Sequence, residues 1–130
     1  MIERVVKVVR RTSQGLYSAV ITRKTSRVAL TRYEPGEWTR PRIGKLFASE
    51  TLIDAEKFLA NARVLGRRYE IWEAEAENPQ RCERCLLIPN HLYRSCLEAF
   101  WSGAISGDIL APEGTVVCDA IKLVRRIAVV

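Results

Sequence analysis

The chain has 130 residues, of which 48% are hydrophobic and 28% are charged. This length suits one domain, and the composition is typical of a folded globular protein rather than a disordered one. No segment approaches the ~18 apolar residues that span a bilayer, and the charged N-terminal stretch is unlike a signal peptide. We therefore expect a single soluble, intracellular domain over residues 1–130, with no membrane partner.

Charge is distributed unevenly along the chain. Residues 1–68 carry 15 Lys or Arg against 6 Asp or Glu, a formal +9, whereas residues 69–130 carry 6 against 9, a formal −3, which gives the net +6. Such polarity predicts a basic surface that attracts a polyanion. The alternative is that the charges form solvated faces that keep a small domain soluble.

The first third of the chain predicts strands. Residues 2–10 are β-branched and lack a helical apolar stripe, which indicates a strand. Residues 16–23 and 27–33 are apolar runs separated by a short polar loop, which predicts a β-hairpin. Residues 34–45 hold two Pro and two Gly and are expected to be irregular, with Trp38 folded back over the core.

A helix is predicted to follow a short extended piece at 46–48. Thr51 and Asp54 resemble a capping box, in which the hydroxyl accepts from the backbone three residues on and the carboxylate favours the positive end of the helix dipole. Gly66 is a plausible end of the helix. The apolar stripe at helical spacing, which predicts core packing, consists of Leu52, Ala55, Phe58, Leu59 and Ala62.

Residues 68–78 alternate with a period of two, which predicts a strand. Trp72 lies on one face with two alanines, and three glutamates lie on the other, solvated face. Because small residues leave room for a close neighbour, we expect Trp72 to be buried and the helix to pack on its face. Residues 115–130 form a long β-branched run that predicts a final strand within the sheet.

Four cysteines in an intracellular protein favour metal or redox chemistry. The segment 79–103 contains the spacing Cys82-x2-Cys85-x5-His91-x4-Cys96. A Cys-x2-Cys pair provides half of a tetrahedral site, and zinc suits thiolate and imidazole ligands. The spacing resembles the retroviral-type zinc knuckle with one extra residue before the histidine. We therefore predict a closed, structural zinc site and a zinc-stapled insertion.

Two alternatives to this ligand set stay open. If His91 and Cys96 both lay inside one helix, five residues apart, they would point about 140° away from each other. Either His91 precedes the helix, or Cys118 replaces His91 or Cys96 as the fourth ligand. The cysteines could instead form disulfides, because intracellular proteins of hyperthermophiles are sometimes disulfide-rich.

Candidate nucleic-acid contacts lie where cations gather near an aromatic side chain. Arg23, Lys24 and Arg27 occupy the predicted hairpin tip, and Arg40 and Arg42 flank Trp38 in the irregular segment. Cations beside an aromatic ring match a site that binds phosphate and stacks on a base. The sequence contains no Walker A loop, GxGxxG, HExxH or GxSxG, so no catalytic residues are predicted and we expect no enzymatic activity.

Arg outnumbers Lys 16 to 5, and Asn and Gln are scarce, which is a thermophile-like bias. With the Tyr33-x2-Gly36-x-Trp38 loop, the Gly44-x-Leu46-Phe47 entry to the helix and the Ile71-Trp72-Glu73 strand, residues 16–127 resemble small uncharacterised proteins of hyperthermophilic archaeal viruses, of the Pyrobaculum spherical virus type. The resemblance implies expression in an archaeal host, with a location in the cytoplasm or the virion. It implies no catalytic residues.

Together these patterns predict an α+β domain, with a mostly antiparallel sheet of about five strands, one main packing helix and a zinc-stapled insertion with a second short helix. The leading hypothesis is a small, basic, zinc-containing viral accessory protein that binds DNA or RNA. The alternative is a virion structural or protein-interaction component, with viral or host proteins as partners and no nucleic-acid or catalytic role.

Overall fold

The computed structural model describes residues 1–19, 29–61, 67–86 and 94–130. Its two helices are α1 (Leu52–Asn61) and α2 (Arg94–Trp101). The strands are β1 (Ile2–Thr12), β2 (Gly15–Ser18), β3 (Arg32–Tyr33), β4 (Trp38–Thr39), β5 (Leu46–Ser49), β6 (Arg68–Glu77), β7 (Gln80–Arg81), β8 (Arg84–Cys85), β9 (Ile109–Leu110), β10 (Thr115–Cys118) and β11 (Ala120–Val129). The prediction of a mostly antiparallel α+β fold is confirmed.

Nine of these strands form one sheet, more than the five or so that were expected. The order is β4-β11-β6-β1-β5-β10-β7, with β2 joined to β1 and β3, while β8 and β9 form a separate pair. The expected count was too low because several strands have only two residues, which is too short to produce an alternating pattern. The hairpin is confirmed where β2 pairs with β3, and its tip, residues 20–28, lies outside the described residues.

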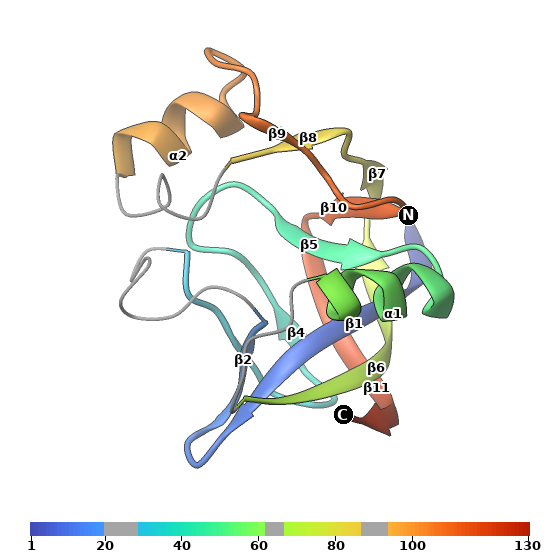
Figure 1. Cartoon of the computed structure of the whole chain (residues 1–130). Helices are drawn as coiled ribbons and strands as arrows, with labels where there is room; N and C mark the ends of the chain where they lie inside the picture. The colour runs from blue at the N-terminus through green and yellow to red at the C-terminus, as the bar shows by residue number, and fades with distance from the viewer. Residues whose placement is uncertain (20–28, 62–66, 87–93) are drawn as a thin grey trace.

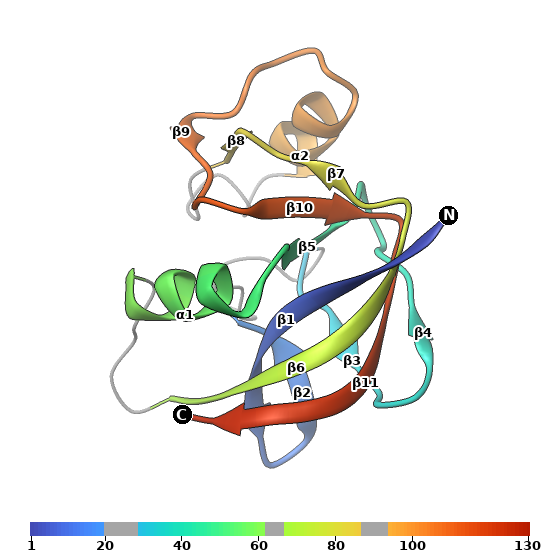
Figure 2. The same ribbon diagram turned by 90° about the vertical axis from the view of Figure 1, so that its right-hand side faces the viewer.

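The sheet curls back on itself (Figures 1 and 2). One edge of β1 pairs with β6 along nearly its whole length, from Ile2 opposite Glu77 to Arg11 opposite Arg68. The other edge of β1 meets β5 at Val6, near the middle of β1, and β2 from Val9 to Thr12, at the end of β1. Because β10 pairs with β5 and continues into β11, which pairs with β6, the strands enclose a common interior.

A polar corner interrupts the predicted final strand between β10 and β11. Asp119 stands at this corner, and its backbone N–H donates to the Glu77 carbonyl at 2.9 Å. Asn78, with a positive φ of 51°, and Lys45 each donate to the Asp119 carboxylate at 2.9 Å. These hydrogen bonds hold the pKa of Asp119 below its ordinary value. These contacts tie the corner between β10 and β11 to the end of β6 and to the segment that precedes β5.

The interior of the curl holds the main core. Its buried residues come from seven strands and are Val5, Val9, Leu16, Tyr33, Leu46, Ala48, Ala74, Ala76, Val116, Cys118, Ile121 and Leu123. The alternation of β6 is confirmed, because Ala74 and Ala76 are fully buried here while the glutamates between them form ion pairs at the surface. Trp72 packs against this core but is only partly buried.

Helix α1 covers the outside of the curl, so the expected packing of the helix on the Trp72 face is wrong. Ala55 and Leu59 of α1 form a second core cluster with Val8, Tyr69 and Ile71. Tyr69 and Ile71 lie on the same face of β6 as Glu73, Glu75 and Glu77, because odd-numbered residues of this strand point outward. The predicted cap is confirmed, since the Asp54 N–H donates to Thr51 Oγ1 at 3.1 Å.

The edge of β11 is irregular. Strand β4 pairs with β11 only at Ile121 and Lys122. Beyond them, the pairing of β11 with β6 shifts between Leu123 and Arg125 and again between Arg126 and Ala128. Each shift inserts one extra residue and bends the strand. Among the described residues, no helix is both long enough and apolar enough to cross a membrane.

Candidate functional site

Two of the predicted zinc ligands lie close together in the chain where β7 leads into β8. Cys82 follows β7 directly and Cys85 is the last residue of β8, and both side chains are partly buried. The Cys82 thiol donates to the Arg84 carbonyl at 3.1 Å. Burial raises the pKa of both thiols, and each charge is close enough to the other that Cys82 further raises the pKa of Cys85. Such a pair of neighbouring sulfurs is the arrangement that a divalent cation stabilises.

Among the described residues, none of the other predicted ligands joins this pair of cysteines in a metal-binding group. Cys96 is partly buried on α2, and His91 lies outside the described residues. Cys118 is fully buried in the interior of the curled sheet, which fits a core side chain. Within the described ranges, no group of three or more His, Cys, Asp or Glu side chains is placed to hold a metal ion. All four cysteines are free thiols.

The predicted nucleic-acid residues near Trp38 are already engaged within the protein. Arg40 makes a two-pronged contact with Glu77, at 3.2 and 3.0 Å. The Lys122 Nζ lies 5.2 Å from the centroid of the Trp38 ring. Arg42 is exposed. This surface is therefore less positive than its sequence suggests, and the predicted contacts Arg23, Lys24 and Arg27 lie outside the described residues.

A different group of cations meets where β1 ends and β6 begins, at the lower end of the molecule in Figure 1. In the register of this pair, Arg11 faces Arg68 and Arg10 faces Tyr69. The pKa of Arg10 is lowered by burial and by the neighbouring charge of Arg67. We call this region the arginine end, and its members are Arg10, Arg11, Arg67, Arg68 and, from β11, Arg126, with Glu70 as the carboxylate among them.

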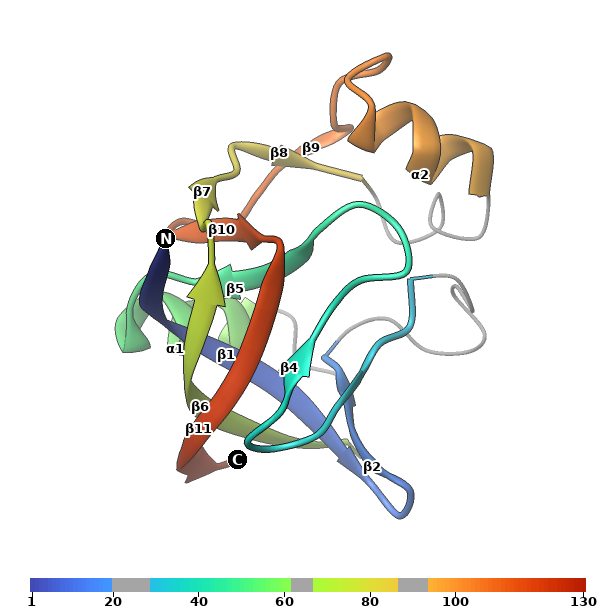
Figure 3. The same ribbon diagram turned by 180° about the vertical axis from the view of Figure 1, so that it is seen from behind.

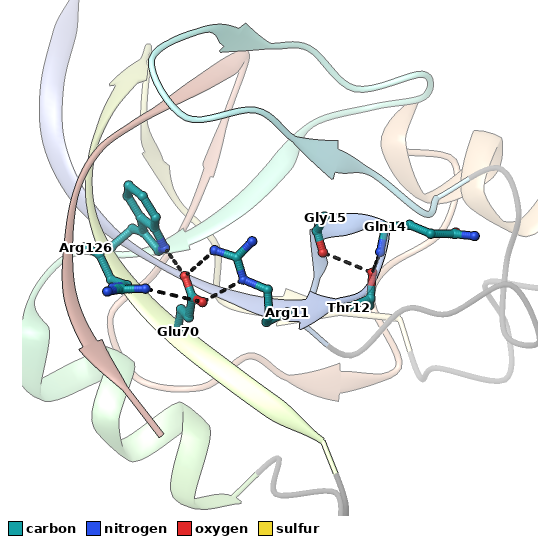
Figure 4. Close-up of polar contacts among 7 residues, drawn as sticks. Arg11, Thr12, Gln14, Gly15, Glu70 and Arg126 are labelled. Atoms are coloured by element: carbon teal, nitrogen blue, oxygen red, sulfur yellow. Dashed lines mark hydrogen bonds and ion pairs between the residues drawn. The ribbon is translucent and has the colours of Figure 1, made fainter.

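Glu70 is the centre of this group. Its side chain is only 4% exposed, and it accepts from Arg11 Nε at 2.8 Å and Arg11 Nη2 at 3.2 Å. The indole N–H of Trp72 donates to it at 2.9 Å, and Arg126 Nη1 lies 3.9 Å away. Figure 4 shows Arg11 and Arg126 approaching the carboxylate from two different strands.

The Glu70 carboxylate is ionised because of these partners. Burial alone would raise its pKa, but the hydrogen bonds from Arg11 and Trp72, together with the charges of Arg11 and Arg126, lower it below the ordinary value. The same contact raises the pKa of Arg11. The site is therefore a buried, fixed negative charge, and the guanidinium groups of Arg11 and Arg126 beside it are more exposed than the carboxylate.

A second unusual group lies inside the curled sheet. Lys7 is buried, and its ammonium donates to the Phe47 carbonyl at 2.5 Å and lies 5.1 Å from the Tyr33 ring centroid. Burial lowers the pKa of Lys7 to about 8 and raises that of Cys118 to about 11. Burial also raises the pKa of Tyr33. Because β1 and β5 share one paired position, the Lys7 contact adds a second link between them.

Sequence reasoning missed both Glu70 and Lys7, although the signal was present in each case. Lys7 has the same parity as Val5 and Val9 in a strand, and Glu70 has the same parity as Trp72 and Ala74. Period-two alternation therefore places each charge on the buried face. A charge at a core position of a strand is the pattern that would have identified them.

The two candidate sites lie far apart in the fold. Figure 3 shows α2 and the β8–β9 pair at the opposite end of the molecule from the C-terminus, where the arginine end lies. A role for the cysteine segment and a role for the arginine end are therefore separable by mutation. Comparison of the chain with protein-family models, with curated proteins and with solved structures gives no match.

Proposed function

We propose that this protein binds a strand of DNA or RNA through the arginine end, as a small accessory protein of an archaeal virus acting in the host cytoplasm or the virion. The observation that carries the proposal is the strand register, which brings five arginines to one end of the sheet, two of which, Arg11 and Arg126, form ion pairs with Glu70. Phosphate contacts by Arg supply most of the affinity for nucleic acid, so such a concentration of guanidinium groups favours a polyanionic ligand.

The proposal predicts binding that depends steeply on salt. Fluorescence anisotropy with labelled single- and double-stranded oligonucleotides of ~20 nucleotides, at several salt concentrations, gives the slope of log affinity against log salt. Replacing Arg67 and Arg68 together with Gln should reduce the magnitude of that slope by about 1.5 units, because two phosphate contacts are lost. These residues are chosen because neither contacts Glu70 in the described network.

The matched control is the double change Arg81→Gln and Arg94→Gln. It removes the same charge from β7 and α2, at the other end of the molecule, where each arginine pairs with a glutamate. Its slope should stay close to that of the parent protein. Absence of binding to every oligonucleotide at ~150 mM salt would contradict the nucleic-acid proposal.

We also propose a structural zinc ion held by Cys82 and Cys85, with His91 and Cys96 completing the set. Supporting it are the short segment that separates the two cysteines and the effect of Cys82, which raises the pKa of the Cys85 thiol. Purified without chelator, the protein should contain about one zinc per chain by elemental analysis. A zinc content near zero, or a disulfide between these cysteines, would exclude this site.

The second candidate function is a protein-interaction role without nucleic acid. It is favoured by exposed apolar side chains near the cysteine segment, where Leu110 is 73% exposed and Ile105 and Ile109 are also exposed. Large exposed apolar side chains on a short, two-stranded element are candidates for contact with a partner protein. If the titrations show no binding, sedimentation of the parent protein and of the variant Ile109→Ser/Leu110→Ser tests for association through this surface.

A further inference from the structure

The contacts with Glu70 use only some of the N–H donors of the surrounding arginines. A guanidinium carries five N–H donors. Arg11 directs two of them at Glu70, through Nε and Nη2, so three remain. Arg126 lies 3.9 Å from the carboxylate as an ion pair, beyond hydrogen-bond distance. Both side chains also face solvent, at 40% and 52% exposure.

The charge balance argues that the arginines do more than neutralise Glu70. One bidentate arginine already satisfies a carboxylate in charge and geometry. Here Trp72 donates a third hydrogen bond, and Arg126 adds a second positive charge. Arg68 faces Arg11 across the strand pair, on the same face of the sheet. The face around Glu70 therefore keeps a surplus of positive charge, with donors directed away from the carboxylate.

A buried carboxylate that accepts hydrogen bonds from an exposed arginine also limits the motion of that side chain. A free arginine side chain loses about 2 kcal/mol of rotamer entropy when a ligand orders it. Arg11 is already ordered by its two hydrogen bonds to Glu70, so much of that cost is met by the fold before a ligand arrives. Planar guanidinium groups held in place suit the paired oxygens of a phosphate.

We infer that Glu70 is a positioning residue, which orders Arg11 through two hydrogen bonds and attracts Arg126 through its charge, so that the two side chains are the arms of a phosphate site that takes a phosphodiester of the nucleic-acid strand. The inference rests on the proposed function and goes further by naming the site and the residue that organises it. It also has a consequence opposite in sign to simple electrostatics. Removing the negative charge of Glu70 makes the region more positive, yet it should weaken binding, because the arms lose their support.

The test compares Glu70→Gln with Glu73→Gln. Both changes remove one negative charge from β6, but Glu73 is on the opposite face, where Arg4 and Arg125 contact it. Binding of a labelled single-stranded 20-mer at ~100 mM salt is measured by anisotropy. We expect Glu70→Gln to weaken binding about fivefold or more, and Glu73→Gln to leave it unchanged or up to about threefold tighter. Unlabelled inorganic phosphate and a mononucleotide, added as competitors, distinguish a general phosphate site from one that needs the strand.

The outcomes separate the two proposals. If the parent protein binds and both variants bind equally or more tightly, the inference about Glu70 is overturned while nucleic-acid binding stands. If the parent protein does not bind at all, the proposed function fails and the phosphate site fails with it. Displacement of the labelled strand by millimolar inorganic phosphate or mononucleotide as completely as by unlabelled strand overturns the assignment to a strand.

A second pair of variants covers the case in which Glu70→Gln fails to fold. Arg126→Lys keeps the charge but removes the planar group, and Arg125→Lys is its neighbour on the other face. Both positions are exposed, so folding should be preserved. Weaker binding by Arg126→Lys alone, with an unchanged salt slope, supports the site, because only geometry has changed. Equal binding by the two variants overturns it.

Discussion

Glu70 and Glu73 lie on opposite faces of β6, and each is flanked by one arginine from β1 and one from β11. Glu70 contacts Arg11 and Arg126 on the inside of the curled sheet, and Glu73 contacts Arg4 and Arg125 on the outside. The two glutamates differ in burial, since the Glu70 side chain is 4% exposed and that of Glu73 is 29% exposed. The same pattern of ion pairs should therefore contribute different amounts to the free energy of unfolding on the two faces.

This difference predicts unequal costs for removing one arginine. Arg11→Gln should reduce the free energy of unfolding by about 2 kcal/mol, because it leaves a buried carboxylate with fewer partners. Arg125→Gln should cost less than about 1 kcal/mol, as exposed ion pairs usually do. Urea unfolding of both variants beside the parent protein measures the difference. Equal costs would mean that Glu70 is stabilised mainly by Trp72 and Arg126.

Lys7 predicts an unusual dependence of stability on pH. Its pKa is about 8 in the folded protein against an ordinary value of 10.5. Between these values the unfolded chain binds more protons, so the free energy of unfolding rises with pH. The gain from pH 7 to pH 9 should be about 1 kcal/mol relative to Lys7→Met, which has no amine to deprotonate.

The thiol of Cys118 acts in the opposite direction at higher pH. Its folded pKa of about 11 exceeds the ordinary 9.0, so the unfolded chain loses its proton first and stability falls above pH 9. The raised pKa of Tyr33 adds to that fall above pH 10. Because Lys7→Met keeps Cys118 and Tyr33, the difference between its unfolding curves and those of the parent protein at pH 7, 8 and 9 isolates Lys7. Parallel changes in the parent protein and in Lys7→Met would show that Lys7 does not titrate in this range.

Gly44 and Gly36 form a matched pair for testing how α2 packs on the sheet. Both have positive φ, 65° and 84°, but a Cβ at Gly44 would lie 2.3 Å from the Trp101 ring, whereas a Cβ at Gly36 meets nothing within 4 Å. Alanine at either position should cost about 1–2 kcal/mol through backbone strain. Gly44→Ala should cost about 1–3 kcal/mol more, because Trp101 must move. Thermal melting compares them, and equal losses would argue against the close packing of Trp101.

The zinc proposal predicts different responses from Cys82 and Cys85 than from Cys118. Cys82→Ser and Cys85→Ser should release metal and lower the melting temperature, because metal-binding energy becomes folding energy at a structural site. Cys118→Ala should keep its metal, since Cys118 lies inside the curled sheet. Zinc content and melting temperature of each variant, with and without chelator, give the result. Retention of zinc in Cys85→Ser would rule out the proposed ligand set.

The sequence predicts the long elements of this fold well because their patterns are local. Residues 68–78 alternate, and the strand that forms there keeps Ala74 and Ala76 inside and Glu73, Glu75 and Glu77 outside. The face that the helix covers could not be read in this way. Tyr69 and Ile71 are on the glutamate face but near the start of the strand, and only the tertiary structure shows that α1 covers this part alone.

The candidate site was harder to predict because it is assembled across strands. Counting charges by halves assigns Arg126 to the acidic part of the chain, yet it joins Arg11 through Glu70. Arg40 counts as a free cation in the sequence, although Glu77 binds it in the fold. Net charge is additive along a chain, whereas a binding surface depends on which charges the strand register brings together.

The two irregularities in β11 bear on how the protein behaves at high concentration. An exposed strand edge offers unpaired N–H and carbonyl groups that can template pairing with another molecule. Beyond Lys122, where pairing with β4 ends, the shifts around Val124 and Ile127 break the even spacing of those groups. A second chain would meet a bent and discontinuous ladder, with Arg125 and Arg126 projecting beside it. The edge is therefore a poor template for a growing fibre, so association of concentrated protein should not proceed through this strand.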